Sequence, residues 1–266
     1  MMTLTGALHV HSTFSDGERS LAELRTLFLD DGCHFAAVAD HADDFDDERL
    51  ATYLDECRRL SDERFVFVPG LEFTCDRRMH IVGYGMTALT DARDPEIVIE
   101  RIRGEHGIAV VAHPQDAAFS WIESFQVLPD GLEVWNTKYD GRYAPRGRTF
   151  RLLYRLQQRK PDMLAFYGQD LHWVKQYRGL RVDVEAETLS PEALLASLRI
   201  GKYSAVRDEL TFPSNGAIDP PLLDRFERTN ARTARIRGWV SAANRLRKKL
   251  GGEIPAPLKS QLRRFF

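Results

Sequence analysis

Cysteine is scarce in this 266-residue chain, which contains only Cys33, Cys57 and Cys75. Their odd number and wide spacing, with no CxxC pair, give no indication of a disulfide framework. Long apolar runs are also missing, because no window approaches the ~20 consecutive apolar residues that cross a bilayer. The N-terminus reaches His9 without the basic head and apolar core of a secretory signal. We therefore expect a cytoplasmic protein without a transmembrane segment.

The net charge of −2 conceals an uneven distribution along the chain. Residues 225–266 contain 12 Lys and Arg against 2 Asp and Glu, a net charge of +10, so the rest of the chain carries −12. This pattern predicts an acidic body with a basic tail. We expect a domain of residues 1–213, a linker-like stretch at 214–223 that contains SNGAIDPP, and a basic helical extension at 224–266.

Short apolar segments alternate with segments of helical periodicity. The spacing of Leu21, Leu24 and Phe28, followed by Gly32, is typical of an amphipathic helix. The alternation predicts an α/β fold with a largely parallel sheet of about seven strands. The predicted strands are residues 5–11, 34–41, 64–73, 79–85, 108–114, 131–136, 163–172 and 181–186. The predicted helices are residues 20–32, 46–60, 94–107, 148–160 and 190–201.

Six of the eight histidines lie where predicted strands begin or end: His9, His11, His41, His80, His113 and His172. A single histidine is more often a packed or exposed residue than a ligand, but the joint placement of six is hard to explain by chance. On a regular strand, His9 and His11 project to the same side. Asp170 and His172 repeat this spacing.

Three carboxylates join the histidines. Asp16 follows the first strand in a Ser-Asp-Gly turn, Glu72 follows the break at Pro69-Gly70, and Asp170 ends a strand. Nine side chains are too many for one four-coordinate zinc ion. Mixed nitrogen and oxygen donors without thiolate favour two or three Zn, Mn or Fe ions. Clustered metals of this kind activate water and stabilise a displacement at phosphorus, so metal-assisted hydrolysis of a phosphate ester is the leading chemistry.

The motifs HVHSTFSDG, ADH, PGLEF, the strand that begins at His80, AHP and GQDLH resemble those of the PHP (polymerase and histidinol phosphatase) family, in the family's order. They cover the chain from about residue 5 to 175. The resemblance implies a distorted (β/α)7 barrel with a two- or three-metal centre at the carboxyl ends of its strands. It also implies a stand-alone metal-dependent phosphoesterase, in which a metal-bound hydroxide attacks phosphorus in line.

The resemblance further implies a ligand set for each metal. The first metal would be held by His9, His11, Glu72 and Asp170. The second would be held by Glu72, as a bridge, with His80 and His113. The third would be held by Asp16, which stands where some members have His, with His41 and His172. All nine positions carry residues able to bind metal, which counts against the degenerate, non-catalytic members of the family.

Three residues are candidates for supporting catalysis. Asp16 or His172 could assist proton transfer if the third metal were absent. Asp40 precedes His41 and would point to the opposite face of a regular strand. We interpret Asp40 as a carboxylate that orients a metal ligand, with a buried capping role as the alternative.

The segment 135–146, WNTKYDGRYAPR, is the main candidate for substrate binding. Lys138, Arg142 and Arg146 could bind phosphate, and Trp135, Tyr139 and Tyr143 could stack on a ring. A solvated loop with packed aromatic residues is the alternative. Arg77, Arg78 and Arg178 also lie near the motifs in sequence.

The basic tail has an apolar stripe at helical spacing: Ile236, Trp239, Val240, Ala243, Leu246 and Leu250. The stripe could dock on the acidic body or could bind a partner or a membrane surface. The charges could instead bind nucleic acid or another polyanion.

Three functions follow in order of preference. The first is a metal-dependent phosphomonoesterase that acts on a small phosphorylated metabolite or nucleotide. The second is an exonuclease or phosphodiesterase that acts on oligonucleotides or cyclic nucleotide phosphodiesters. The third is a non-catalytic, metal-stabilised binding module.

Overall fold

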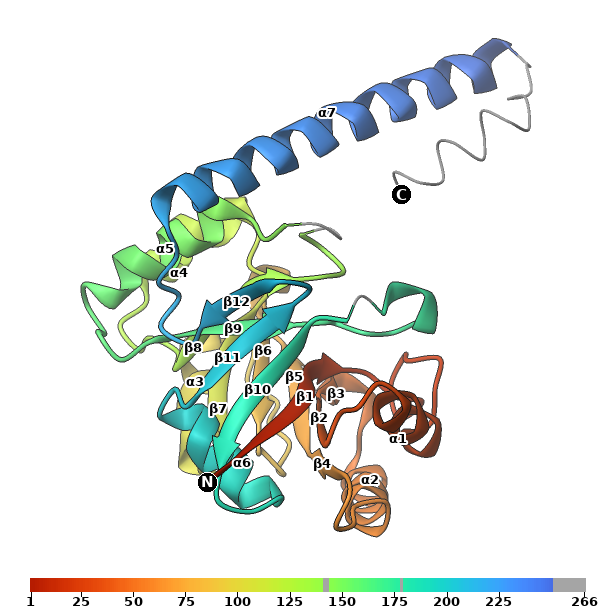
Figure 1. Ribbon diagram of the computed structural model, residues 1–266, viewed down its shortest axis with the longest axis vertical. Coiled ribbons are helices and arrows are strands. Elements are labelled where there is room, and N and C mark those ends of the chain that lie inside the picture. The colour runs from red at the N-terminus through yellow and green to blue at the C-terminus, as the bar shows by residue number, and fades with distance from the viewer. Residues whose placement is uncertain (141–143, 178, 251–266) are drawn as a thin grey trace. The chain divides into compact units, whose positions relative to one another are not determined.

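A computed structural model describes residues 1–140, 144–177 and 179–250 (Figure 1). The chain divides into two units, Met1–Ile218 and Asp219–Phe266. Within the described ranges, no helix combines the length and the apolar character that spanning a membrane requires. The predicted linker-like stretch 214–223 contains the division between the two units, and the domain organisation proposed from the sequence stays a prediction.

Twelve described strands form two mixed sheets of six, which confirms the α/β prediction. The first sheet contains, in spatial order, β12 (Leu210–Pro213), β11 (Tyr203–Arg207), β10 (Arg181–Ala186), β1 (Met2–Val10), β2 (Phe35–Val38) and β4 (Val66–Val68). The second contains β3 (Asp40–His41), β5 (Gly70–Thr74), β6 (His80–Tyr84), β7 (Ile108–Ala112), β8 (Gly131–Asn136) and β9 (Leu164–Gly168).

The chain passes from the first sheet to the second at two places, where a strand is interrupted by one residue. Ala39 separates β2 from β3, and Pro69, which has no backbone N–H to donate, separates β4 from β5. β2 pairs parallel with β4, and β3 pairs parallel with β5. Two consecutive strands therefore begin in the first sheet and end in the second.

Backbone hydrogen bonds also join the first and last of these strands. Gln169 N donates to Leu8 O over 2.9 Å, and His11 N donates to Leu171 O over 3.0 Å. Seven strands thus follow one another in the order β1, β2/β3, β4/β5, β6, β7, β8 and β9. In the part of the chain that the structure describes, the ladders do not close into one continuous barrel. The seven strands therefore form a distorted arrangement, divided between two sheets, in place of a closed barrel.

One strand of the seven runs against its neighbours. β6 pairs antiparallel with both β5 and β7, so that the start of β6 lies beside the ends of the other two. His80 is paired with Thr74 at the end of β5 and with Ala112 at the end of β7. This reversal explains why a histidine at the beginning of a strand joins residues that lie at strand ends.

Helices of the first unit follow the strands and are closed by local caps. They are α1 (Leu21–Asp30), α2 (Asp47–Arg59), α3 (Pro95–Gly104), α4 (Phe119–Ser124), α5 (Gly147–Gln157) and α6 (Pro191–Arg199). Ser20 and Glu23 form a capping box at α1, while Asp94 and Ser190 cap α3 and α6, which begin with proline. The short elements α4, β11 and β12 were not predicted.

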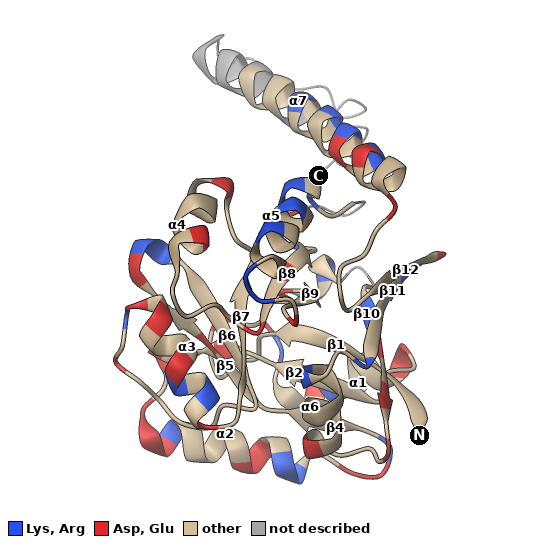
Figure 2. Cartoon of the chain, turned by 90° about the vertical axis from the view of Figure 1, so that its left-hand side faces the viewer, with Lys and Arg blue, Asp and Glu red and all other residues tan. Residues whose placement is uncertain are grey.

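The second unit contains one long helix, α7 (Pro220–Leu250), in agreement with the predicted helical tail up to its last described residue. Acidic and basic residues both occur near its start (Figure 2). The sequence there contains Asp224, Arg225 and Glu227. Trp239 is 81% exposed. The partner of the tail stays a prediction, and the apolar and basic positions beyond residue 250 lie outside the described residues.

Candidate metal centre

His9 and His11 lie side by side at the end of β1, with ring centroids 5.1 Å apart. Both side chains are buried. They converge as predicted, but not by regular alternation, because the pairing of β1 with β2 shifts register between Leu8 and Val10 and His9 has a φ of 60°. A local irregularity of the strand, typical of sheets beside functional sites, therefore aims His9.

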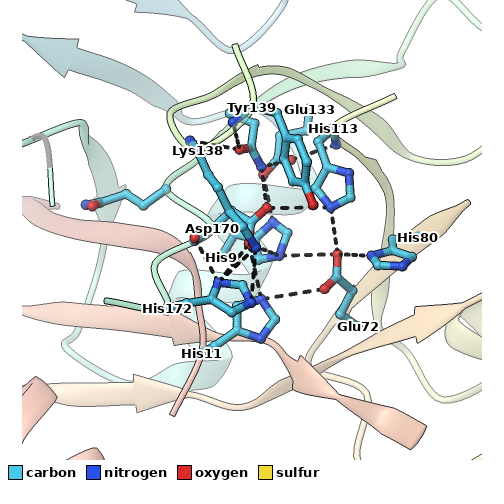
Figure 3. Close-up of polar contacts among 12 residues, drawn as sticks. His9, His11, Glu72, His80, His113, Glu133, Lys138, Tyr139, Asp170 and His172 are labelled. Atoms are coloured by element: carbon cyan, nitrogen blue, oxygen red, sulfur yellow. Dashed lines mark hydrogen bonds and ion pairs between the residues drawn. The ribbon is translucent and has the colours of Figure 1, made fainter. Parts of the chain in front are cut away.

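Glu72 stands at the centre of the histidines (Figure 3). It lies in the middle of β5, and its carboxylate is buried. Five histidine side chains have a ring nitrogen within 3.5 Å of it: His113 at 3.0 Å, His80 at 3.1 Å, His41 at 3.2 Å, His9 at 3.4 Å and His11 at 3.5 Å. A carboxylate with imidazoles around both oxygens has donors for two ions, and the bridging role of Glu72 stays a prediction.

Asp170 is the second buried carboxylate of the centre, just after β9. Its oxygens lie 3.1 Å from His172 Nδ1, 3.5 Å from His11 Nε2 and 3.6 Å from His113 Nε2. Asp170 has a φ of 50°, and His113 has a φ of 28°. With His9, three residues of the centre thus adopt a left-handed backbone, which is costly for residues other than glycine and concentrates at functional sites.

The outer part of the centre contains Asp16, His41 and His172. The Asp16 side chain is 53% exposed, and its Oδ1 lies 3.1 Å from His172 Nε2 and 3.6 Å from His41 Nε2. The turn that follows β1 therefore returns Asp16 to the histidines, as predicted. His41 and His80 are about a fifth exposed, so the centre opens to solvent on the side of these two residues.

Asp40 is buried on the opposite face of the strand from His41. Its carboxylate accepts hydrogen bonds from Ser12 N, Ser12 Oγ and Ser15 Oγ over 2.6 to 2.7 Å. Burial raises the pKa of Asp40 even though these three donors oppose the change. The contacts are those of a buried cap that holds the 12–15 turn, and through that turn Asp40 acts on the placement of Asp16. Its assignment as a catalytic residue stays a prediction.

The charges within the centre suit the binding of cations. Burial alone would raise the pKa values of Glu72 and Asp170, but the neighbouring histidines, His9 above all, hold both pKa values well below their usual range. Burial lowers the pKa of His11 well below that of a free histidine, so that this imidazole is neutral. Burial alone would lower the pKa values of His9 and His113, but the neighbouring carboxylates outweigh it and raise both, so a metal ion would displace a proton from each of these rings. Ionised carboxylates and neutral imidazoles are the forms that coordinate metal.

Several buried ring nitrogens of the centre have no hydrogen-bond partner within the described ranges, which indicates whether metal ions fit there. Among the described residues, His9 Nε2 and both ring nitrogens of His11 are buried without a hydrogen-bond partner. Buried polar atoms are rarely left unpaired unless an ion or water completes them. The donor atoms lie within 4.8 Å of one another in four overlapping groups: His11, Asp16, His41 and His172; His9, His113 and Asp170; His9, His11 and Glu72; and His41, Glu72 and His80. The residues present therefore fit divalent metal ions.

Glu133 is a buried carboxylate behind the donors that was not predicted from the sequence. Glu133 Oε1 lies 2.9 Å from His9 Nδ1, and Oε2 accepts hydrogen bonds of 2.8 Å from His113 N and Asn136 Nδ2. Gly168 leaves room for this carboxylate, since a Cβ there would lie 1.6 Å from Glu133 Oε1. The available signal was a lone glutamate in the apolar strand GLEVWN, because a buried carboxylate requires partners.

The three predicted phosphate-binding residues have different positions. Lys138 reaches the centre, with Nζ 3.1 Å from Asp170 Oδ1 and 3.2 Å from both ring nitrogens of His172. Arg146 forms an ion pair with the buried Asp140 and donates to Pro114 O over 3.1 Å. Arg142 lies outside the described residues. The substrate-binding assignments stay predictions.

Comparison with known proteins shows the fold. No protein-family model and no curated protein matches the chain. A two-domain protein from Bacteroides vulgatus, which contains a predicted PHP-like metal-dependent phosphoesterase, is 16% identical with a TM-score of 0.58. The match covers 79% of this chain, which spans only 66% of that protein's length. PsfC from Pseudomonas syringae is 15% identical with a TM-score of 0.55, over 79% of this chain and 93% of PsfC. The fold that the sequence motifs imply is therefore confirmed.

Proposed function

We propose that the chain is a metal-dependent hydrolase of phosphate esters, and that its substrate is a small phosphorylated metabolite or nucleotide. The observation that carries this proposal is the convergence of six histidines and three carboxylates in one partly open centre. A purely structural metal site needs about four ligands and is closed. More donors, and an opening to solvent, favour a site that admits a substrate.

Two buried carboxylates would share the ions. Glu72, with histidines on both oxygens, would bridge two ions, and Asp170 would hold the first of them together with His9 and His11. Bound divalent ions would supply Lewis acidity, which makes water a nucleophile near neutral pH and neutralises charge on the ester oxygens. Mn, Zn and Fe fit the mixed nitrogen and oxygen donors.

Lys138 would recognise the phosphate of the substrate. Its Nζ lies against Asp170 and His172, at the inner edge of the same donors. Ions bound there would compete with the lysine for these ligands, and the ammonium would then be available to a phosphate oxygen. An ammonium acts on phosphate as a point charge without a fixed geometry.

Proton transfer would fall to residues at the outer part of the centre. Asp16 is exposed and lies 3.1 Å from His172 Nε2, so this pair connects the centre to solvent. If no third ion is bound between them, either residue could pass a proton to the departing alcohol oxygen. The three cysteines are free and buried, which supports the cytoplasm as the compartment.

The test uses purified protein stripped of metal and reloaded with Mn, Zn or Fe. Phosphate release is measured from a panel of phosphomonoesters that includes nucleotides, and mononucleotide release is measured from a 5′-phosphorylated oligonucleotide. The variant His9→Ala, His11→Ala serves as the blank. His106→Asn is the matched control, because His106 is exposed, lies away from the centre and has a φ of 59°, which asparagine tolerates.

Release of phosphate from monoesters, lost in the blank and kept in the control, would support the proposal. Release of mononucleotides from the oligonucleotide would replace it with a nuclease and give the basic tail a substrate. If no metal restores turnover of either substrate, the chain is better described as a metal-stabilised binding module.

A further inference from the structure

A pocket of about 300 Å³ adjoins the metal centre on the side of His80 and His113. These two histidines are shared by the pocket and the centre, since both contact Glu72 as well. Their rings meet edge to face with centroids 5.1 Å apart. Arg77, Arg78 and Trp121 also line the pocket. A group held in this pocket is therefore a neighbour of whatever the metal centre binds.

The two arginines belong to a turn with an unusual backbone. Arg77 and Arg78 have φ values of 53° and 58°, so two consecutive residues other than glycine are left-handed. The turn is held by hydrogen bonds from Met79 N to Asp76 O over 3.2 Å and from Cys75 N to Met79 O over 2.7 Å. Backbone strain that is maintained in this way beside a reactive centre is a sign of function.

The charges of these two arginines are not neutralised. Among the described residues, neither guanidinium forms an ion pair with a carboxylate. Other arginines of this region do: Arg93 pairs with Asp43 over 2.7 Å, and Arg148 pairs with Asp116 over 2.7 Å. The pocket thus has two positive charges available to a ligand.

Trp121 gives the pocket a flat aromatic surface. The Arg77 guanidinium lies 4.5 Å from the centre of the indole, within the range of a cation–π contact. Phe125 packs edge to face against the indole, with ring centroids 5.4 Å apart. The contact fixes the plane of one guanidinium while its N–H groups stay free to bind an anion in two-pronged fashion.

We infer that this pocket binds a second anionic group, carried by the alcohol part of the phosphate ester whose phosphate lies at the metal centre. This inference rests on the proposed function and narrows its substrate class to esters with a carboxylate or a further phosphate on the leaving group. Two unpaired guanidinium groups match either anion, and the pocket has room for a small ring or chain beside the anion.

A matched series of three compounds tests the inference: phenyl phosphate, 4-carboxyphenyl phosphate and 1,4-phenylene bisphosphate. They share one ring and one reacting phosphate, and differ in the group opposite to it. The kcat/KM for phosphate release is compared between the metal-loaded wild type and the variant Arg77→Gln, Arg78→Gln. Because each compound is compared across the two proteins, differences in intrinsic reactivity cancel.

The kcat/KM of the variant should fall about tenfold or more for one or both compounds with a second anionic group. It should fall little for phenyl phosphate. The reason is that hydrogen bonds between charged groups are stronger than those between neutral groups. Which compound loses more distinguishes carboxylate from phosphate. The variant Arg59→Gln, Arg64→Gln removes the same charge from the exposed end of α2 and the turn before β4, and should show no selective loss. Equal loss for all three compounds, or no loss, would overturn the inference.

The failure of the proposed function would be visible separately. If phenyl phosphate and its relatives are not hydrolysed with any metal, the same compounds are titrated calorimetrically into the metal-loaded proteins. Tighter binding of a doubly charged compound to the wild type than to Arg77→Gln, Arg78→Gln would still support the pocket. Equal binding to both proteins would overturn it.

Discussion

Replacement of Glu133 by glutamine changes one oxygen into an NH₂ group in a fully occupied network. Glu133 Oε2 accepts from His113 N and Asn136 Nδ2, so the amide oxygen must remain on that side. The amide NH₂ then faces His9 Nδ1, which lies 2.9 Å from the other oxygen. Because an NH₂ group can only donate there, Nδ1 must accept, and the single proton of the neutral His9 ring must then lie on Nε2.

The expected loss of metal affinity follows from the proposed role of His9 Nε2 as a metal-binding atom. In the wild type, Nε2 of His9 is the atom that faces Glu72 and Asp170, at 3.4 and 3.9 Å, and it has no hydrogen-bond partner. A proton on that atom would exclude it as a ligand. Loss of a partner that orients a metal-binding histidine typically weakens metal affinity by about 10- to 100-fold, which is about 1.4 to 2.7 kcal/mol.

The assay is competition for Zn or Mn between the protein and a chromophoric chelator, with metal content measured after dialysis. Circular dichroism checks that the fold is kept. Glu185→Gln, on an exposed position of β10, is the control for the same chemical change and should bind metal as the wild type does. Wild-type metal affinity in Glu133→Gln would show that Glu133 does not set the tautomer of His9.

Three further predictions concern residues around the same centre. Gly168→Ala places a methyl group 1.6 Å from Glu133 Oε1 and should lower the free energy of unfolding by about 1 to 3 kcal/mol, measured by urea denaturation, whereas Gly104→Ala, with open space at its Cβ, should not. Burial raises the pKa of Asp140 from 3.8 to about 6, so the folded chain loses stability as pH rises through that interval and Asp140 ionises. Asp140→Asn lacks this ionisation. Its free energy of unfolding relative to that of the wild type, measured by urea denaturation, should therefore increase by up to about 3 kcal/mol between pH 4 and pH 7. Lys138→Met should lower kcat/KM for phosphomonoesters by about tenfold with unchanged metal content, and an unchanged kcat/KM would remove Lys138 from substrate binding.

The metal donors were accessible to sequence reasoning because their signal is local. A histidine or carboxylate at the end of an apolar run marks a strand end, and the ends of parallel strands meet at one edge of a sheet. His41, His113 and Asp170 could be placed in this way. His80 stands at the start of its strand, and only the antiparallel direction of β6, which its own residues do not specify, brings it beside the ends of the neighbouring strands.

Residues that position the metal donors, and do not themselves bind metal, could be predicted less well from the sequence. Asp40 was expected to orient a ligand, but its partners are Ser12 and Ser15 in a turn whose path no periodicity describes. Glu133 was a lone glutamate in an apolar strand, and only its burial against His9 shows its role. Long-range contacts of this kind depend on how strands are arranged, which local patterns do not specify.

Because strand pairing among the described residues does not join the two sheets into one, metal ions bound between them would also stabilise the fold. His9 belongs to β1 in the first sheet and His11 follows that strand directly, whereas Glu72 belongs to β5 in the second sheet. An ion held by all three would be a cross-link that closes a loop of about 60 residues, and a link of that length removes about 4 kcal/mol of chain entropy from the unfolded state. Binding of the ions would then be thermodynamically linked to folding of the first unit. A chain without metal would have a lower free energy of unfolding as well as no catalytic activity.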